Sequence, residues 1–375
     1  MIIDAFLRWT ETAGAGDRAK AANALGRAYL GGGIQAEQRR AALMAMSHLL
    51  DDPSPQVRLA LAQAIAASVE APRAIIVALA EDQPEIACTV IAQSPVLTDS
   101  DLVDLVGRGD GMTRGLVAAR ENLHRAVSAA LVEVGDLGEI TLLLENETAA
   151  VPQVSLTRIA ERFGYSADMR RLLLEREDLP AEARQRLVTE VGAALAGSDL
   201  VKMVLTRPRL ERLTAEATGT AAVAIAGAVT SAELPALVEH MRSTGKLTPA
   251  LLIHALCTGK VDFFAGAMVA LSGLDASRVR SLLATGRMHA VRAMFEAAGL
   301  RRDIATVFVE ATMLWRGAGL MGSTESVCER LLETCRTSEH ASAAVGELLD
   351  IVEKLQYAEI RSAARSYAIG FPIAA

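Results

Sequence analysis

The sequence contains few aromatic residues, few cysteines and no long hydrophobic run, and each shortage excludes a class of protein. Aromatic residues make up only 3% of the 375 residues, which argues against a β-sandwich or β-barrel, where they are enriched. The four cysteines form no C-x-x-C pair, which argues against a cysteine metal site. We expect them to be free, buried thiols. The longest strongly apolar run, residues 221–229, is far shorter than the roughly 20 residues needed to span a bilayer.

Basic residues are also outnumbered by acidic ones. The chain has 38 Lys and Arg residues against 45 Asp and Glu residues, which gives a formal net charge of −7. An acidic surface repels phosphate backbones, so we do not expect nucleic acid as a partner. The first residues lack the basic segment of a signal peptide. Without a spanning segment either, the sequence predicts a cytoplasmic protein with no membrane partner.

The common catalytic motifs are missing as well. The sequence has no G-x-S-x-G nucleophile elbow, no H-E-x-x-H helix and no phosphate-binding G-K-S/T loop. The six histidines occur singly, and none lies three or four residues from another, as a helical metal-binding pair would require. We therefore expect no catalytic residue, no cofactor and no metal ion, and we expect the protein not to be an enzyme.

The residues that are abundant favour helices. The chain is rich in Ala, Leu, Val, Glu and Arg, and hydrophobic residues make up 51% of it. Ala and unbranched side chains lose little conformational entropy in a helix. The hydrophobic content is too high for a disordered chain. The composition therefore predicts an all-α protein.

A short phrase occurs twice and reveals a repeat. Residues 120–124 read Arg-Glu-Asn-Leu-His, and residues 176–180 read Arg-Glu-Asp-Leu-Pro. The leucine is followed eight and nine residues later by Leu-Val in both copies. The same apolar skeleton starts at positions 97, 123, 151 and 179, and again at 247, 274 and 300. Helix pairs that cannot bury their apolar faces alone must stack, so the pattern predicts an α-solenoid with a period of about 26–28 residues in two arrays.

The interruptions of this pattern predict the domain boundaries. Residues 1–33 form a helical lead-in that ends in a Gly31-Gly32-Gly33 hinge, because three glycines disfavour a helix. Residues 34–197 are the first array. Residues 198–316 contain an irregular junction and the second array, and residues 317–375 form C-terminal helices.

One segment of this acidic chain is positively charged. Six arginines and a single acid lie between Arg278 and Arg302. Arginine binds phosphate and carboxylate groups through its planar fork, which makes this patch a candidate site for an anion or an acidic partner. The other interpretation is a set of solvated helix faces paired with acids elsewhere. The candidate binding residues are Arg278, Arg280, Arg287 and Arg292.

The arginines of the repeated phrase, Arg120 and Arg176, have a structural interpretation. A polar residue repeated at equivalent positions usually bonds to the carbonyls of a neighbouring loop or to a nearby acid. We therefore expect them to stabilise the turns rather than to form two copies of a site.

Besides the Arg-Glu-Asn/Asp-Leu turns, the chain contains Leu-Leu-Leu-Glu-Asn at 142–146 and Leu-Thr-Pro-Ala-Leu-Leu-Ile at 247–253. On these motifs the chain resembles an uncharacterised bacterial family of helical-repeat proteins described as HEAT-like. The resemblance covers roughly residues 37–310. It implies an all-helical scaffold and identifies no catalytic residue.

The favoured function is that of an interaction scaffold or regulatory adaptor that binds a protein or peptide on its helical surface. A homo-oligomer is left open. One alternative is a sensor that binds a small anionic ligand at the Arg278–Arg302 patch. A less favoured alternative is a HEAT-like enzyme that acts on nucleic acid, which the acidic charge argues against.

Overall fold

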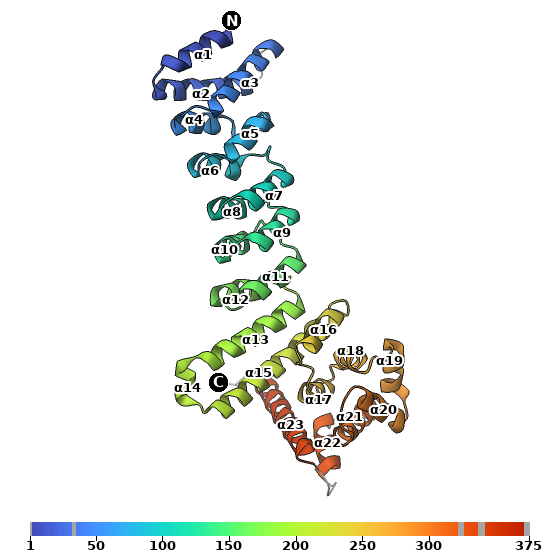
Figure 1. Cartoon of the computed structure of the whole chain (residues 1–375). Coiled ribbons are helices and arrows are strands. Elements are labelled where there is room, and N and C mark those ends of the chain that lie inside the picture. The colour runs from blue at the N-terminus through green and yellow to red at the C-terminus, as the bar shows by residue number, and fades with distance from the viewer. Residues whose placement is uncertain (1, 32–34, 322–325, 337–341, 371–375) are drawn as a thin grey trace. The chain divides into compact units, whose positions relative to one another are not determined.

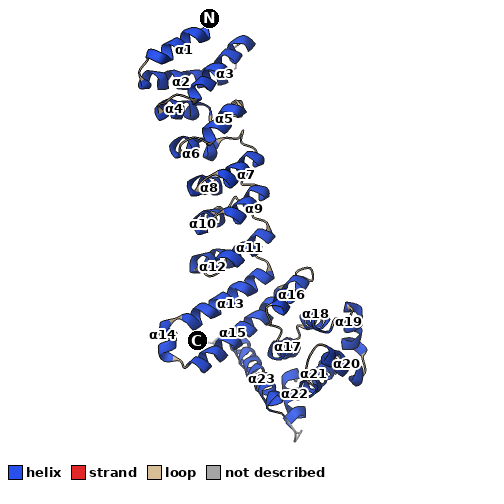
Figure 2. Ribbon diagram, in the orientation of Figure 1, coloured by secondary structure: helices blue, strands red, loops and turns tan. Residues whose placement is uncertain are grey.

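The chain folds into helices throughout its described length. The computed structural model describes residues 2–31, 35–321, 326–336 and 342–370. Within these residues there are 23 α-helices and no strand, and Figure 2 colours the described chain as helices and loops. The all-α prediction is confirmed. Gly31 ends a helix, whereas the rest of the predicted glycine hinge, residues 32 and 33, lies outside the described residues.

The helices divide into two compact units along the chain. Unit 1 is Met1–Leu179 and unit 2 is Pro180–Ala375. The division coincides with the start of a long helix at Ala181, whereas the sequence pattern placed its first array boundary after residue 197. The predicted domain boundaries stay a prediction.

Unit 1 consists of twelve described helices arranged in two rows (Figure 1). Each even-numbered helix from α2 to α10 contacts the next even-numbered one, and odd-numbered helices contact one another in the same way within α1–α5 and α7–α11. This packing is consistent with an α-solenoid. The helices are α1 (Ile2–Thr12), α2 (Ala15–Leu30), α3 (Ala36–Leu50), α4 (Pro55–Ile65), α5 (Arg73–Ala80), α6 (Pro84–Gln93), α7 (Asp99–Arg108), α8 (Gly111–Ala118), α9 (Arg125–Val134), α10 (Leu137–Glu145), α11 (Gln153–Phe163) and α12 (Ala167–Leu174).

The repeat skeleton marks the buried side of each helix pair. Helices α5, α7, α9 and α11 start at residues 73, 99, 125 and 153, which are spacings of 26, 26 and 28 residues. The first skeleton residue lies just before α7, α9 and α11, and in each case it is buried. The paired positions inside the helices are buried too. In the copy of the skeleton that starts at Leu179, Leu187 is buried but Val188 is only half-buried.

Local sequence signals set the helix starts. Thr98 precedes α7 and accepts a hydrogen bond from the Asp101 amide. Asp110 precedes α8 and accepts one from the Thr113 amide. Pro55 and Pro84 occupy the first positions of α4 and α6. Those positions suit proline because the first helical N–H groups have no intrahelical acceptor.

Unit 2 begins with a hairpin of two long helices and continues through helices of mixed length (Figure 1). Most of its buried apolar residues form two clusters. The hairpin helices α13 and α15 pack along each other. The helices are α13 (Ala181–Gly197), α14 (Asp199–Val204), α15 (Arg207–Ala228), α16 (Leu234–Ser243), α17 (Pro249–Cys257), α18 (Val261–Ser272), α19 (Ala276–Thr285), α20 (Met288–Ala297), α21 (Arg302–Met321), α22 (Val327–Arg336) and α23 (Ala343–Gly370).

Three phenylalanines pack against one another in the larger hydrophobic cluster of unit 2. Phe264, Phe295 and Phe308 come from α18, α20 and α21, and all three are fully buried. Their ring centroids lie 5.7–6.0 Å apart, within the range of favourable aromatic pairs. Thus a few of the scarce aromatic residues are concentrated at one point of the core.

Candidate functional site

The four predicted arginines lie on two consecutive helices of unit 2. Arg278 and Arg280 are exposed on α19, and Arg287 is the exposed residue that precedes α20. Arg292, on α20, is half-buried, and its Nε has no hydrogen-bond partner among the described residues. Their role in binding an anion stays a prediction.

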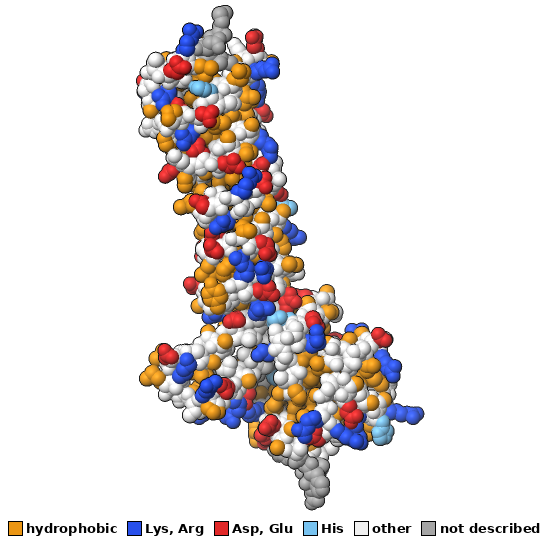
Figure 3. Space-filling model, viewed as in Figure 1, with side chains coloured by type: hydrophobic (Ala, Val, Ile, Leu, Met, Phe, Trp, Pro, Cys, Tyr) orange, Lys and Arg blue, Asp and Glu red, His pale blue; other side chains and the backbone are white. Residues whose placement is uncertain are grey.

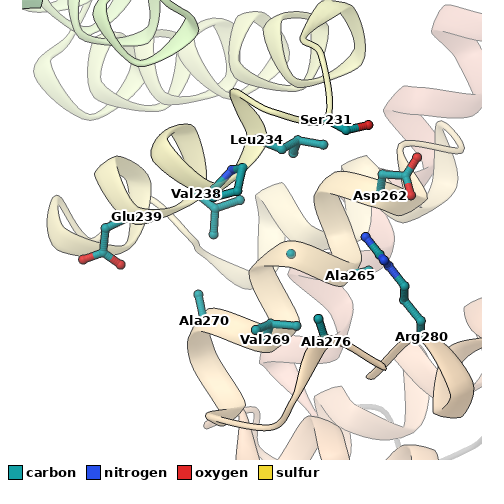
Figure 4. A pocket seen from close by; sticks show the side chains of 12 residues that line it. Ser231, Leu234, Val238, Glu239, Asp262, Ala265, Val269, Ala270, Ala276 and Arg280 are labelled. Carbon is teal, nitrogen blue, oxygen red and sulfur yellow. The ribbon is translucent and has the colours of Figure 1, made fainter. Parts of the chain in front are cut away.

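One of these arginines lines a pocket. The pocket has a volume of about 270 Å³ and lies among α16, α18 and α19. Figure 4 shows Arg280 and Asp262 on the same side of this space, with Glu239 across from them. The apolar part of the wall includes Leu234 and Val238.

The charges in this pocket are mixed. Glu239 accepts two hydrogen bonds of 2.7 Å from Arg242, so its charge is compensated. These bonds lower the pKa of Glu239. The remaining charges are Arg280 and Asp262, and a plain anion at Arg280 would also meet the repulsion of the Asp262 carboxylate. The pocket is therefore better suited to a small ligand that carries both an acidic group and a basic or hydrogen-bond-donating group.

A second set of arginines, not recognised in the sequence, stabilises unit 1. Each is the fourth residue of an even-numbered helix and donates to a backbone carbonyl five or six residues earlier. Three of them also pair with a carboxylate of the neighbouring repeat. These contacts satisfy loop carbonyls before four of the six even-numbered helices, which makes the arginines structural. The arginines are Arg18, Arg58, Arg114 and Arg170.

The arginines of the repeated phrase are structural too, as predicted. Arg120 donates to the carbonyls of Ile91 and Ser94 at the end of α6. Arg176 forms hydrogen bonds of 2.8 and 2.9 Å with Asp178. The last four carbonyls of a helix lack partners inside it, so Arg120 supplies a missing donor.

The phrase also contains a strained backbone position. Asn122 has a φ of 56°, in the left-handed region that asparagine tolerates better than most residues. Asn122 donates its amide to the Thr148 hydroxyl at 2.9 Å, which links this turn to the next repeat.

The histidines and cysteines do not assemble a metal site. Within the described ranges, no group of three His, Cys, Asp or Glu residues is placed to hold a metal ion. The four cysteines are free, and Cys257 and Cys328 are buried as expected. Cys88 is exposed, so its predicted burial is wrong. It lies on the outer side of α6, where the helix faces solvent rather than the neighbouring repeat.

Both rows of unit 1 contain ion pairs between successive repeats, such as Arg158 with Glu133 at 3.6 Å in the odd-numbered row and Arg114 with Glu139 at 3.4 Å in the even-numbered row. Both rows also expose large apolar side chains. In the even-numbered row these lie on three successive helices, α8, α10 and α12. We call these three residues the even-helix face, and they are Met112 (60% exposed), Leu142 (42%) and Leu174 (42%).

Charge is sparse on three consecutive helices of the even-numbered row. The charged residues of α4, α6 and α8 are Arg58, Glu85 and Arg114, whereas α10 and α12 together carry Glu139, Glu145, Asp168, Arg170 and Arg171. Arg58 and Arg114 are engaged in the structural bonds described above. Sequence reasoning missed this surface because it sought charged and catalytic residues. The signal it could have used is the low charge of alternate helices.

Among the helices in the described part of the chain, none combines the length and the apolar character required to cross a bilayer. Comparison with curated proteins and with solved structures finds no match. A family model matches residues 86–344, which is more than half of the chain, and its description is an uncharacterised protein conserved in bacteria. The chain therefore belongs to this uncharacterised bacterial family, DUF2336.

Proposed function

We propose that the protein is a non-enzymatic, cytoplasmic interaction scaffold that binds a protein or peptide partner through the even-helix face of unit 1. The observation that carries this proposal is the exposure of Met112, Leu142 and Leu174 on three neighbouring helices of one row. Contiguous exposed apolar side chains commonly mark protein-interaction sites.

The composition of α8 supports the same assignment. Charged side chains are depleted at the centres of protein interfaces, and Met is enriched there. Helix α8, which carries Met112, has Arg114 as its single charged residue, and Arg114 is already paired with Glu139 at 3.4 Å. A partner segment on this part of the face would bury apolar area without removing an isolated charge of α8 from water.

The experiment compares a face variant with a matched control. The double variant Met112→Asp/Leu142→Asp places two carboxylates on the face, whereas Val154→Asp adds one to α11, where Val154 is 82% exposed. Full-length protein with a photoreactive amino acid at position 174 is crosslinked in native cells, and the captured partner is then purified.

We expect saturable binding of that partner to the wild-type protein and to Val154→Asp. We expect at least a tenfold weaker affinity for the face variant, because a buried carboxylate without a partner is costly. Equal affinity for all three proteins would refute the assignment of this face.

A second function is supported by the pocket that Arg280 lines. Here the protein would sense a small ligand with an acidic group, held by Arg280 on the side of the pocket that also carries Asp262. Thermal unfolding with a panel of nucleotides and amino acids tests it, because a ligand at 100 times its Kd adds about 2.7 kcal/mol of stability. The shift should vanish in Arg280→Gln and persist in Arg278→Gln, an exposed neighbour on the same helix. No shift with any ligand would reject this function.

A further inference from the structure

The end of the α13–α15 hairpin exposes a second cluster of large apolar side chains. We call this cluster the hairpin tip, and it consists of Leu195, Leu200, Met203 and Val204. Leu200, Met203 and Val204 are 78%, 83% and 82% exposed, and Leu195 is 54% exposed. Figure 3 shows apolar side chains at this end of the hairpin, with basic and acidic ones beside them.

The short helix α14 contributes nothing to the core of unit 2. None of its six residues is buried. Its main packing partner among the described helices is α13. Leu200, Met203 and Val204 follow i, i+3, i+4 spacing, so they share one side of the helix. Exposing three such side chains together on a helix that the core does not require indicates that this side contacts something else.

Basic residues surround the hairpin tip. Residues 195–213 contain four cations and two acids, so this segment is positive within a chain of net charge −7. Lys202 lies 3.7 Å from Asp199, and Arg207 lies 2.9 Å from Glu211. The remaining cations are Arg209 and Arg212, both exposed.

We propose that the hairpin tip docks onto the surface of a membrane that contains anionic lipids. Stable attachment to a membrane surface usually combines inserted apolar side chains with basic residues that face acidic headgroups. Leu200, Met203 and Val204 supply the first component, and Arg209 and Arg212 supply the second.

The charge distribution favours this occupant over a second copy of the chain. A two-fold symmetric contact would place one positive tip against another, and the like charges would repel. Docking of this kind requires no spanning helix. The expectation of no membrane partner rested on the missing spanning segment and does not bear on surface docking. The proposal is independent of the even-helix face in unit 1.

The experiment is co-sedimentation of the full-length protein with lipid vesicles. Vesicles of phosphatidylcholine alone are compared with an equal mixture of phosphatidylcholine and phosphatidylglycerol. We expect binding to the mixed vesicles only, and weaker binding at high salt because salt screens exposed charges. The variant Arg209→Gln/Arg212→Gln should lower the partition coefficient roughly thirtyfold, from about 1 kcal/mol per cation near an anionic surface.

A second variant, Leu200→Asp/Met203→Asp, tests the apolar component and should abolish sedimentation. The control Val69→Asp changes a residue that is 75% exposed in unit 1 and should bind like the wild type. Circular dichroism checks the fold of each variant, and if the apolar variant does not fold, the arginine variant decides.

Three results would overturn the proposal. One is no binding to the anionic vesicles, and another is equal binding to neutral ones. The third is a wild-type dimer, measured by light scattering, that both tip variants convert to a monomer without changing vesicle binding. That result would assign the tip to a second copy of the chain.

Discussion

Replacing Asp52 with asparagine should remove one of the main links between the first repeats of unit 1. Asp52 follows α3 and accepts hydrogen bonds of 2.7 and 3.0 Å from Nε and Nη2 of Arg18 in α2. It also accepts the Ser54 amide at 2.9 Å, and its carbonyl accepts Nη1 of Arg58 at 2.5 Å. The side chains of Asp52 and Arg18 are only 6% and 14% exposed.

We expect Asp52→Asn to lower the free energy of unfolding of this region by about 3 kcal/mol. Removing one partner of a buried ion pair leaves the other charge uncompensated, which typically costs about 3–5 kcal/mol. We take the lower end of this range because the asparagine oxygen retains one acceptor for Arg18 or Ser54.

The effect should depend on pH. The hydrogen bonds from Arg18, together with the Ser54 amide, lower the pKa of Asp52 even though burial opposes them. An aspartate in an unfolded chain has a pKa of about 3.9. The stability that Asp52 contributes is therefore complete above about pH 5, and it is lost as the pH falls through the lower pKa of the folded state. The difference between wild type and Asp52→Asn should shrink below about pH 4.

Hydrogen exchange measured by mass spectrometry suits this test, because repeat arrays often unfold in parts. Amides of α2 and α4 should exchange about a hundredfold faster in Asp52→Asn, which corresponds to about 3 kcal/mol. The control is Asp51→Asn, one residue away and exposed, which should leave exchange unchanged. Equal exchange in wild type and Asp52→Asn at pH 7, or a difference that stays constant down to pH 3, would refute the reasoning.

Two further predictions concern packing in unit 2, and urea unfolding checks both. A Cβ at Gly192 in α13 would lie 2.9 Å from Thr214 Cγ2 in α15, so Gly192→Ala should destabilise the hairpin by about 1–3 kcal/mol. A Cβ at Gly219 in α15 meets no atom within 4 Å, so Gly219→Ala should stabilise it by about 0.5–1 kcal/mol, and effects of the same sign would contradict this packing. Phe308→Ala should cost about 3–5 kcal/mol because it empties part of a fully buried core, and a loss below about 1 kcal/mol would show that the aromatic cluster is not packed as described.

The sequence predicted the helical class and the period of unit 1 because both follow from local patterns. A solenoid buries the same positions in every repeat, so the spacing of Leu97, Leu123 and Val151 reports directly on the core. Turn chemistry is local too. That is why the structural interpretation of Arg120 could be reached from its repetition.

Pairing across repeats was harder to foresee. Arg18 bonds to Asp52, 34 residues away, and Arg58 bonds to Asp82, 24 residues away. The sequence separation varies because the helices differ in length: α2 and α3 have 16 and 15 residues, whereas α4 and α5 have 11 and 8. A search at a fixed period therefore overlooks these pairs. Their common property is the fourth position of a helix, which becomes visible only when the helix starts are known.

The candidate sites were determined mainly by tertiary structure. The sequence supplied Arg280 as a candidate, but Asp262 and Glu239 line the same pocket only because α16, α18 and α19 pack together. The exposure of Met112 and Met203 likewise depends on which helix sides the neighbours cover. An apolar residue in a helix reads the same in sequence whether it is buried or exposed. The sequence alone therefore determined the helices, their period and the net charge, and only packing decided which apolar side chains remain exposed to contact a partner.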